Sequence, residues 1–293
     1  MHFYISWTRS DPVFCEIFKN SKVLISPSGT QKSFSLDKWK SQPDKVIVDS
    51  SAFYYMLNFR TPPPPKEIFK EQMRIIKGHT CPVILCPFDY PINPRNGNIQ
   101  STYRAIEKTL GNAYEFLELF ERKELHKNPQ ISYMGVIQGT DKSSIQFCIR
   151  ELQRMGFEKF GLGSLAALYN SEEILRRVSY AVDVVGRDRL HVFGISRLDV
   201  ISQLREFNIE SIDSTRPTKA AIYNAVFYSN PFRTYGIYAA RNADKYPRLL
   251  HAPLPCECPS CKVNPDLLLV TQGKKAINAR AVHNYYHLIM HLV

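Results

Sequence analysis

Hydrophobic residues along the chain gather into short apolar runs that are separated by longer amphipathic segments. Most of the runs are continuously apolar, as is typical of parallel strands buried on both faces. Their lengths and their β-branched residues favour strands over helices. Eight runs have this character: residues 2–6, 22–26, 45–51, 83–89, 132–138, 159–163, 191–195 and 210–214.

Helical periodicity fills the gaps between these runs from residue 66 onward. It is clearest in residues 66–78, 101–125, 141–156 and 171–186. Strands that alternate with helices indicate βαβ units and a parallel sheet, and eight of them predict an α/β fold of the TIM (β/α)₈ barrel type. A doubly wound open sheet is the alternative, but no Gly-rich phosphate loop follows an early strand.

The two ends of the chain depart from this alternation. Residues 7–21 and 27–44 are poor helices, so residues 1–44 form either N-terminal barrel strands or a flap. The last part of the chain carries a cysteine cluster. We therefore predict a barrel over residues 1–250 and a small zinc-binding subdomain, packed on the barrel, over residues 251–293.

The amino-acid composition indicates which kinds of partner the protein can bind. The net charge is +11, and such an excess attracts polyanions, among which nucleic acid is the commonest. No apolar run approaches the roughly 20 residues that a membrane span needs, and residues 1–12 lack the layout of a signal peptide. We expect a cytoplasmic protein (host cytoplasm if it is encoded by a phage) that binds nucleic acid and no membrane.

Polar residues stand where several predicted strands end, which in a TIM barrel is the edge that carries the active site. Carboxylates accept hydrogen bonds from ring N–H and amino groups, and an amide both donates and accepts, so together they suit the polar edge of a purine. Phe53 could stack on such a ring, and Gly163 and Gly194 allow a flat ligand to approach the backbone. The strand-end set is Asp49, Asp89, Gln138 and Asp213. Each residue alone is more typical of a helix cap or a buried anchor.

A cluster of cysteines predicts a metal site. Cys256, Cys258 and Cys261 follow a C-x-C-x-x-C spacing, and His283 and His287 lie one helical turn apart further on. Three thiolates and one imidazole complete the closed tetrahedral set of a structural zinc site. His283 is the better fourth ligand and His287 the fallback; the alternative is three ordinary cysteines.

The order of these motifs resembles that of the tRNA-guanine transglycosylases, which exchange a guanine in a nucleic acid for a 7-deazaguanine. The resemblance extends over residues 45–284 and implies a TIM barrel with a zinc subdomain near its C-terminus. The matching pieces are DSSAF (49–53), FD (88–89), GVIQG (135–139), GLGSLA (161–166), HVFGIS (191–196), IDSTRPTKAA (212–221) and CECPSC with HN (256–284).

The resemblance also implies roles for these residues. Asp213 matches the nucleophile that attacks the sugar C1′, and Asp49 matches the group that moves the proton of the leaving and entering bases. Such a double displacement needs a carboxylate nucleophile and a separate acid/base, as in retaining glycosidases. The base-binding residues would be Phe53, Asp89, Gln138, Gly163, Ser164, Leu165 and Phe193. Arg216 and Lys219 would hold flanking phosphates, or else are solvated charges beside a helix start.

Two departures from the family pattern bear on the substrate. Ser164 replaces the second glycine of the base-binding loop, and Tyr169 stands where the bacterial enzymes often carry a glutamate. The latter favours a neutral incoming base, 7-cyano-7-deazaguanine (preQ0). The short chain, an unfamiliar first 45 residues and the lack of an appended RNA-binding domain resemble the branch that modifies DNA. The alternatives are tRNA as substrate and a non-catalytic nucleic-acid-binding barrel; a homodimer is left open.

Overall fold

A computed structural model describes residues 1–93, 98–237 and 252–292 of the chain. Nine short strands form one parallel sheet, and each overlaps a run expected from the sequence and extends past that run by one residue at most. The strands are β1 (His2–Trp7), β2 (Lys22–Ile25), β3 (Lys45–Val48), β4 (Val83–Leu85), β5 (Ile131–Tyr133), β6 (Gly135–Ile137), β7 (Phe160–Leu162), β8 (Leu190–Val192) and β9 (Ser211–Ser214).

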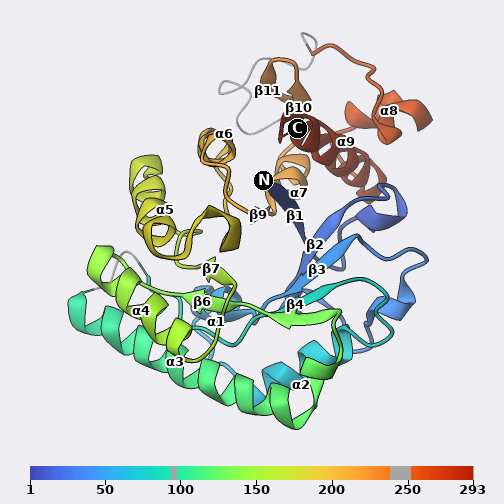
Figure 1. Cartoon of the computed structure of the whole chain (residues 1–293). Helices are drawn as coiled ribbons and strands as arrows, with labels where there is room; N and C mark the ends of the chain where they lie inside the picture. Colours follow the sequence, from blue (N-terminus) through green and yellow to red (C-terminus); the bar gives the residue numbers. More distant parts are fainter. Residues whose placement is uncertain (94–97, 238–251, 293) are drawn as a thin grey trace.

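The sheet closes into a barrel (Figure 1). Its order is β5-β4-β3-β2-β1-β9-β8-β7-β6, so the first strand pairs with the last. The two ends of this order, β5 and β6, are separated only by Met134, and they act as one interrupted strand that pairs with β4 on one side and β7 on the other. The expected TIM barrel is therefore confirmed, and β1 and β2 are barrel strands and not a flap.

Successive side chains along each strand point alternately into the barrel and outward toward the helices, which gives two apolar layers. One cluster takes one residue from each of several strands and fills the barrel interior, whereas the residues next to them pack outward against helices. Tyr4, Leu24 and Ile47 belong to the interior cluster. Because side chains alternate, the positions two residues further along these strands also point inward, at the C-terminal mouth of the barrel.

Helices cover the outside of the barrel, and α2 to α6 follow it in sequence order in Figure 1. The sequence explains their bounds locally: Asp141 and Ser144 form a reciprocal capping box at the start of α4. The helices are α1 (Ala52–Leu57), α2 (Pro65–Ile75), α3 (Ile99–Arg122), α4 (Lys142–Arg154), α5 (Ser171–Val185), α6 (Leu198–Glu206), α7 (Arg216–Ile222), α8 (Pro259–Val263) and α9 (Lys274–Leu292).

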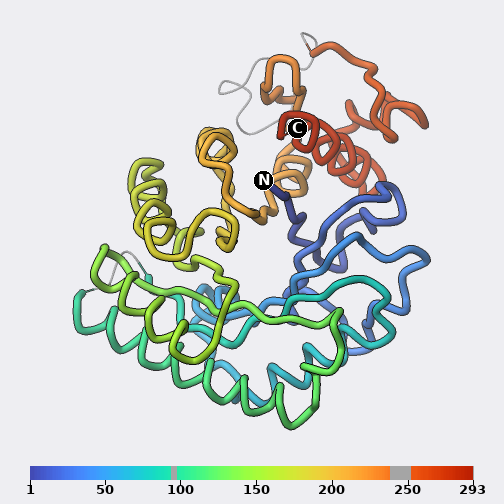
Figure 2. The backbone as a smooth tube through the Cα atoms, in the orientation of Figure 1, coloured from blue at the N-terminus to red at the C-terminus, as the bar shows by residue number. Residues whose placement is uncertain are grey.

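No α-helix follows β1 or β2 among the described residues; only the short 3-10 turns η1 (Phe14–Glu16), η2 (Pro27–Gly29) and η3 (Leu36–Lys38) do. The C-terminal helix α9 covers part of this face, and Figure 2 shows it returning beside the N-terminal strands. The Tyr285 ring lies 6.0 Å from that of Phe3 and 5.0 Å from that of Phe14. The two chain ends therefore share one part of the core.

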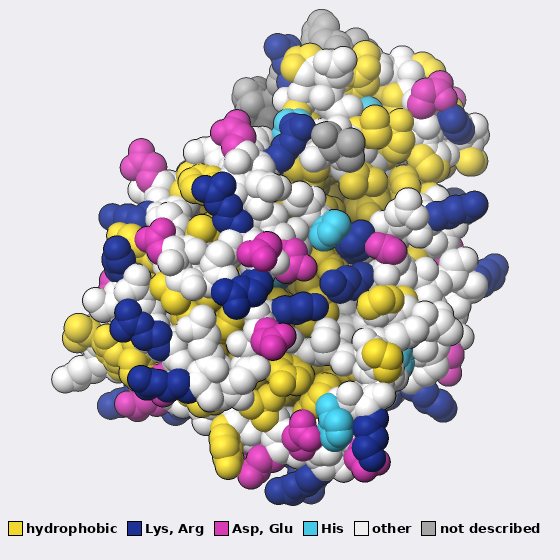
Figure 3. All heavy atoms as spheres, viewed as in Figure 1, with side chains coloured by type: hydrophobic (Ala, Val, Ile, Leu, Met, Phe, Trp, Pro, Cys, Tyr) yellow, Lys and Arg dark blue, Asp and Glu magenta, His cyan; other side chains and the backbone are white. Residues whose placement is uncertain are grey.

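Outside the barrel, α9 also packs against α7 and against a hairpin of β10 (Ala225–Ser229) and β11 (Phe232–Gly236). The domain boundary expected at residue 250 falls in residues 238–251, outside the described residues. None of the described helices is long and apolar enough to cross a membrane. Lys and Arg side chains spread over the face seen in Figure 3, interspersed with acidic ones.

Candidate active site

A cavity of about 530 Å³ opens at the C-terminal ends of the barrel strands. Its walls contain three carboxylates, from Asp49, Asp89 and Asp213, together with several serines and the aromatic rings of Phe53 and Phe193. Asp49 directly follows β3, Asp89 lies in the loop after β4 and Asp213 lies in β9, so the barrel brings the three acids together at the edge where TIM barrels carry their chemistry.

Asp213 is held at both carboxylate oxygens and is only 4% exposed. Ser6 Oγ donates to its Oδ2 at 2.6 Å, and the backbone N–H of Gly194 donates to its Oδ1 at 2.8 Å. His191 Nε2 lies 3.2 Å from the same Oδ1, and Nδ1 of the ring lies 2.9 Å from Ser211 Oγ. These contacts on both oxygens fix the plane of the carboxylate.

Asp49 is held differently. Ser26 Oγ donates to its Oδ2 at 2.7 Å and the Ser51 backbone N–H donates to its Oδ1 at 2.9 Å. Burial raises the pKa of Asp49 to about 7; the two hydrogen bonds oppose the shift, and the charges of Asp213 and Asp89 add to it. A carboxyl with this pKa can both give and take a proton near neutral pH.

Asp89 accepts at both oxygens from buried partners. Ser50 Oγ donates to Oδ1 at 2.9 Å and Gln138 Nε2 donates to Oδ2 at 2.6 Å. Burial raises the pKa of Asp89 to about 6, against these bonds. Gln138 is fully buried behind the cavity wall, where its Oε1 accepts from Ser164 Oγ. A Cβ on Gly163 would stand 2.5 Å from Gln138 Nε2, so a larger residue there would have to displace the Gln138 amide from Asp89.

Six of the seven residues predicted to bind the base line the cavity: Phe53, Asp89, Gly163, Ser164, Leu165 and Phe193. The seventh, Gln138, reaches it only through Asp89 and Ser164. The Phe193 ring needs space that Gly161 leaves, because a Cβ there would lie 2.2 Å from Phe193 Cε2. Tyr169 does not line the cavity and is 78% exposed.

The two predicted phosphate contacts lie in different places. Lys219 is exposed and lines the cavity mouth. Arg216 is half-buried and its guanidinium carbon lies 5.9 Å from the centre of the Phe227 ring, beside β10. The position of Lys219 therefore suits a polymer at the mouth better than that of Arg216.

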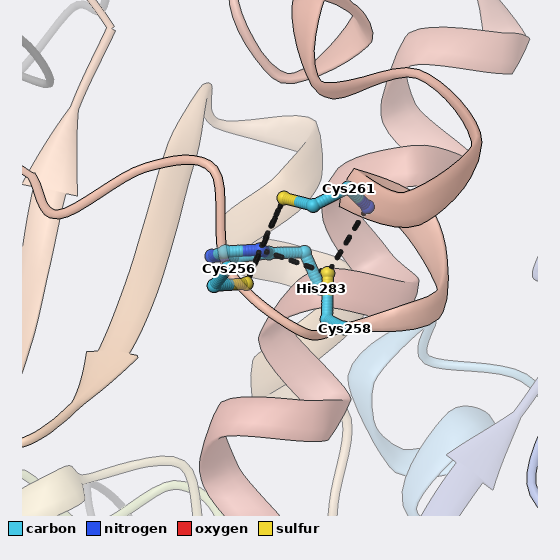
Figure 4. Close-up of side chains that lie close together, drawn as sticks. All are labelled: Cys256, Cys258, Cys261 and His283. Atoms are coloured by element: carbon cyan, nitrogen blue, oxygen red, sulfur yellow. Dashed lines mark hydrogen bonds between the residues drawn. The ribbon is translucent and has the colours of Figure 1, made fainter.

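The cysteine cluster forms a compact metal centre (Figure 4). One ligand atom from each of Cys256, Cys258, Cys261 and His283 lies within 4.8 Å of the others. Sulfurs bound to one tetrahedral zinc at about 2.3 Å stand about 3.8 Å apart, and those of Cys256 and Cys261 are 3.6 Å apart. The donor set fits the structural zinc that the sequence predicts.

The surroundings of His283 fix which ring nitrogen faces the metal. Its Nε2 lies 2.7 Å from the Phe227 carbonyl oxygen and so carries the proton, which leaves Nδ1 for the metal. Nδ1 lies 3.3 Å from Cys258 Sγ. The fallback ligand, His287, lies 3.2 Å from Cys256 Sγ but outside the group of four. With four protein ligands, zinc would tie the segment around Cys258 to α9 and have no position left for substrate.

A comparison with known protein families decides the assignment. The family described as queuine tRNA-ribosyltransferase (TGT) matches residues 27–292, nearly the whole chain. The chain belongs to the TGT family. This membership agrees with the barrel and with the Cys3His cluster described above.

Individual TGT relatives are distant. A queuine tRNA-ribosyltransferase of Methylacidiphilum infernorum is 27% identical over 82% of this chain and 61% of its own length. One of Actinobacillus pleuropneumoniae serotype 5b is 25% identical over 91% of this chain and 67% of its own length. The chain thus spans 61% and 67% of the length of these two curated relatives.

Four side chains that hold the TGT carboxylates were not predicted from the sequence: Ser6, Ser26, Ser50 and His191. Two of them could have been found from the alternation of side chains along the strands. Ser6 and Ser26 stand two positions beyond Tyr4 and Leu24, which face the barrel interior, so they point to the same side. His191 lies within an apolar run and carries no local signal of its own.

Proposed function

We propose that this protein replaces guanine in a nucleic acid with a 7-deazaguanine through a covalent aspartyl-sugar intermediate. The observation that supports the proposal is that two carboxyl groups in one cavity have different hydrogen-bond partners and that one of them has a raised pKa. Asp213 meets three polar partners, Ser6, the Gly194 N–H and the buried His191, whereas Asp49 has two donors. Burial raises the pKa of Asp49 to about 7. Such a pair supplies a charged nucleophile and a separate acid/base.

The exchange takes two displacements at the same carbon. A carboxylate oxygen of Asp213 attacks the sugar C1′ and forms an ester while the C1′–N9 bond to guanine breaks. Protonated Asp49 gives its proton to the departing guanine. The incoming base then returns a proton to Asp49 and attacks C1′, which breaks the ester and frees the Asp213 carboxylate. Two inversions retain the configuration of the sugar.

The remaining walls of the cavity suit the base. Asp89 accepts hydrogen bonds and would face the ring N–H and amino groups of a guanine, and Phe53 would stack on its plane. The backbone of residues 163–166 would face the 7-substituent. Among the described residues that line the cavity, the carboxylates are Asp49, Asp89 and Asp213, and each has a role in this scheme. No further carboxylate among these residues is left to pair with a cationic 7-substituent, which supports neutral preQ0.

The proposal also specifies which nucleic acid is the substrate. The unfamiliar first 45 residues underlie the prediction of DNA, whereas the relatives are named for tRNA. In either polymer the target nucleotide must leave the stack to reach an enclosed cavity, which costs a few kcal/mol and least in a single strand. We keep DNA as the primary proposal and tRNA as the alternative.

One experiment tests reaction and polymer together. Radiolabelled guanine is incubated with the protein and either duplex DNA, single-stranded DNA or bulk tRNA, and preQ0 is then used to chase the label out. We expect incorporation into DNA and its reversal by preQ0. Incorporation into tRNA alone would establish the alternative substrate. No incorporation into any polymer, with binding intact, would leave a non-catalytic nucleic-acid-binding barrel.

A further inference from the structure

Ser164 adopts a backbone conformation that favours glycine. Its φ is 58°, in the left-handed region, and glycine occupies this region without steric cost. The residue lies in the loop after β7, half-buried at the cavity wall. A serine held in this conformation suggests that its hydroxyl has a task that glycine could not perform.

The hydroxyl stands in a chain of hydrogen bonds that runs from Ile92 through Gln138 to Asp89. The backbone N–H of Ile92 donates to Ser164 Oγ at 2.6 Å, and a backbone N–H can only donate. The Ser164 proton is therefore free for Gln138, and the hydroxyl donates to Oε1 of that amide. This leaves the amide nitrogen facing Asp89, to which it donates at 2.6 Å.

The other oxygen of Asp89 has a similar chain. The backbone N–H of Ala52 contacts Ser50 Oγ at 3.3 Å, and Ser50 Oγ donates to Asp89 Oδ1 at 2.9 Å. Both oxygens of Asp89 thus meet donors that belong to chains beginning at a backbone N–H. If the Gln138 amide were reversed, its oxygen would face Asp89 Oδ2, and that contact is favourable only when the carboxyl carries a proton.

We propose that Ser164 is a specificity-determining positioning residue, which locks the Gln138 amide so that Asp89 faces the cavity as a hydrogen-bond acceptor. An accepting Asp89 selects bases that present N–H donors, such as the ring N–H and amino group of guanine. It rejects bases with a ring acceptor at the same place. The inference rests on the proposed function for its choice of ligand, and it does not depend on the sugar chemistry.

The test compares guanine with 2-aminopurine, a fluorescent base that keeps the amino group but has an acceptor in place of the ring N–H. Binding of 2-aminopurine is followed by its fluorescence, and guanine is added as competitor. The wild-type protein should prefer guanine. Ser164→Ala retains the backbone strain and Ser164→Gly relieves it, but both delete the hydroxyl. In both variants the ratio of the affinities for guanine and 2-aminopurine should fall about tenfold, which is the effect of losing one hydrogen bond to a charged group.

Two further measurements separate positioning from general damage. In base exchange, the Ser164 variants should raise KM for guanine more than they lower kcat, whereas a disrupted fold would lower kcat as well. In a Gln138→Met background, Ser164→Ala should cause no further loss of preference, because the effect passes through the amide.

The outcomes are distinct from those that test the proposed function. Unchanged preference in both Ser164 variants, or a full additional loss in the Gln138→Met background, would overturn the role of Ser164. A wild-type protein that prefers guanine but transfers it to no polymer would overturn the proposed exchange and leave the role of Ser164 standing.

Discussion

Removal of the Ser26 hydroxyl should make Asp49 a weaker acid. Ser26 Oγ donates to Asp49 Oδ2 at 2.7 Å, and this bond opposes the effect of burial on the pKa of Asp49, which is about 7. A hydrogen bond to a charged group contributes about 1.5–3 kcal/mol, and one pKa unit corresponds to about 1.36 kcal/mol. Because water in the cavity can replace part of the lost bond, we take the lower value and expect the pKa in Ser26→Ala to rise by about one unit.

The pH dependence of kcat/KM for the polymer measures this shift. In the free enzyme Asp49 must be protonated to act as an acid, so kcat/KM should fall as the pH rises through its pKa. This alkaline limb should move from about pH 7 in the wild type to about pH 8 in Ser26→Ala.

Ser28→Ala is the matched control. Ser28 lies two residues further along and also lines the cavity, but its hydrogen bond to Ser51 uses the backbone N–H. Its alkaline limb should stay at the wild-type position. An unmoved limb in Ser26→Ala, with exchange otherwise intact, would refute the assignment of Asp49 as the acid.

The remaining predictions concern other parts of the molecule. Asp213→Asn should trap no denaturation-resistant adduct with nucleic acid, because an amide is a poor nucleophile; a gel that still shows the adduct would assign the nucleophile elsewhere. Cys258→Ala should lose the zinc, found by metal analysis near one per chain in the wild type, and unfold its tail at lower temperature; a folded, active and zinc-free wild type would contradict this. Lys219→Ala should weaken polymer binding and reduce the salt slope by about one, measured by titration at several salt concentrations. Since folding raises the pKa of Asp49 above its unfolded value, the folded state binds the proton more tightly, and stability should decrease from about pH 4 to about pH 7. That decrease should be smaller in Asp49→Asn when urea unfolding is followed across this range.

Much of the fold could be predicted from local patterns. The strands lie in continuous apolar runs, and the capping box at Asp141 marks the start of α4. The spacing of the cysteines contains the chemistry of the zinc site. Asp213 and Asp49 could be proposed as a pair because the ends of parallel strands meet at one edge of a barrel.

The partners of these acids depend on pairings that no local pattern contains. Ser6 and Asp213 are 207 positions apart, and they meet because β1 pairs with β9 in a register that sets Tyr4 opposite Asp213. His191 also depends on strand pairing: it reaches Asp213 because β8 pairs with β9, and it is the third polar partner of that carboxylate. Gln138 directly follows β6, where its position would point into the barrel. Its amide instead lies buried behind the cavity wall, in space that the missing side chain of Gly163 leaves.

The position of α9 over the first strands affects how the chain can fold during synthesis. The apolar side chains of Phe3 in β1 and of Phe14 in the turn after it stay uncovered until Tyr285 is synthesised, about 270 residues later in the chain. The β1–β9 pairing that closes the barrel also joins distant parts of the chain, because β9 is synthesised about 200 residues after β1. Contacts between such distant parts of a chain form slowly, and the apolar surface stays exposed in the meantime. The nascent chain should therefore depend on chaperones until its C-terminal helix emerges, and a truncation before α9 should aggregate rather than yield an open barrel.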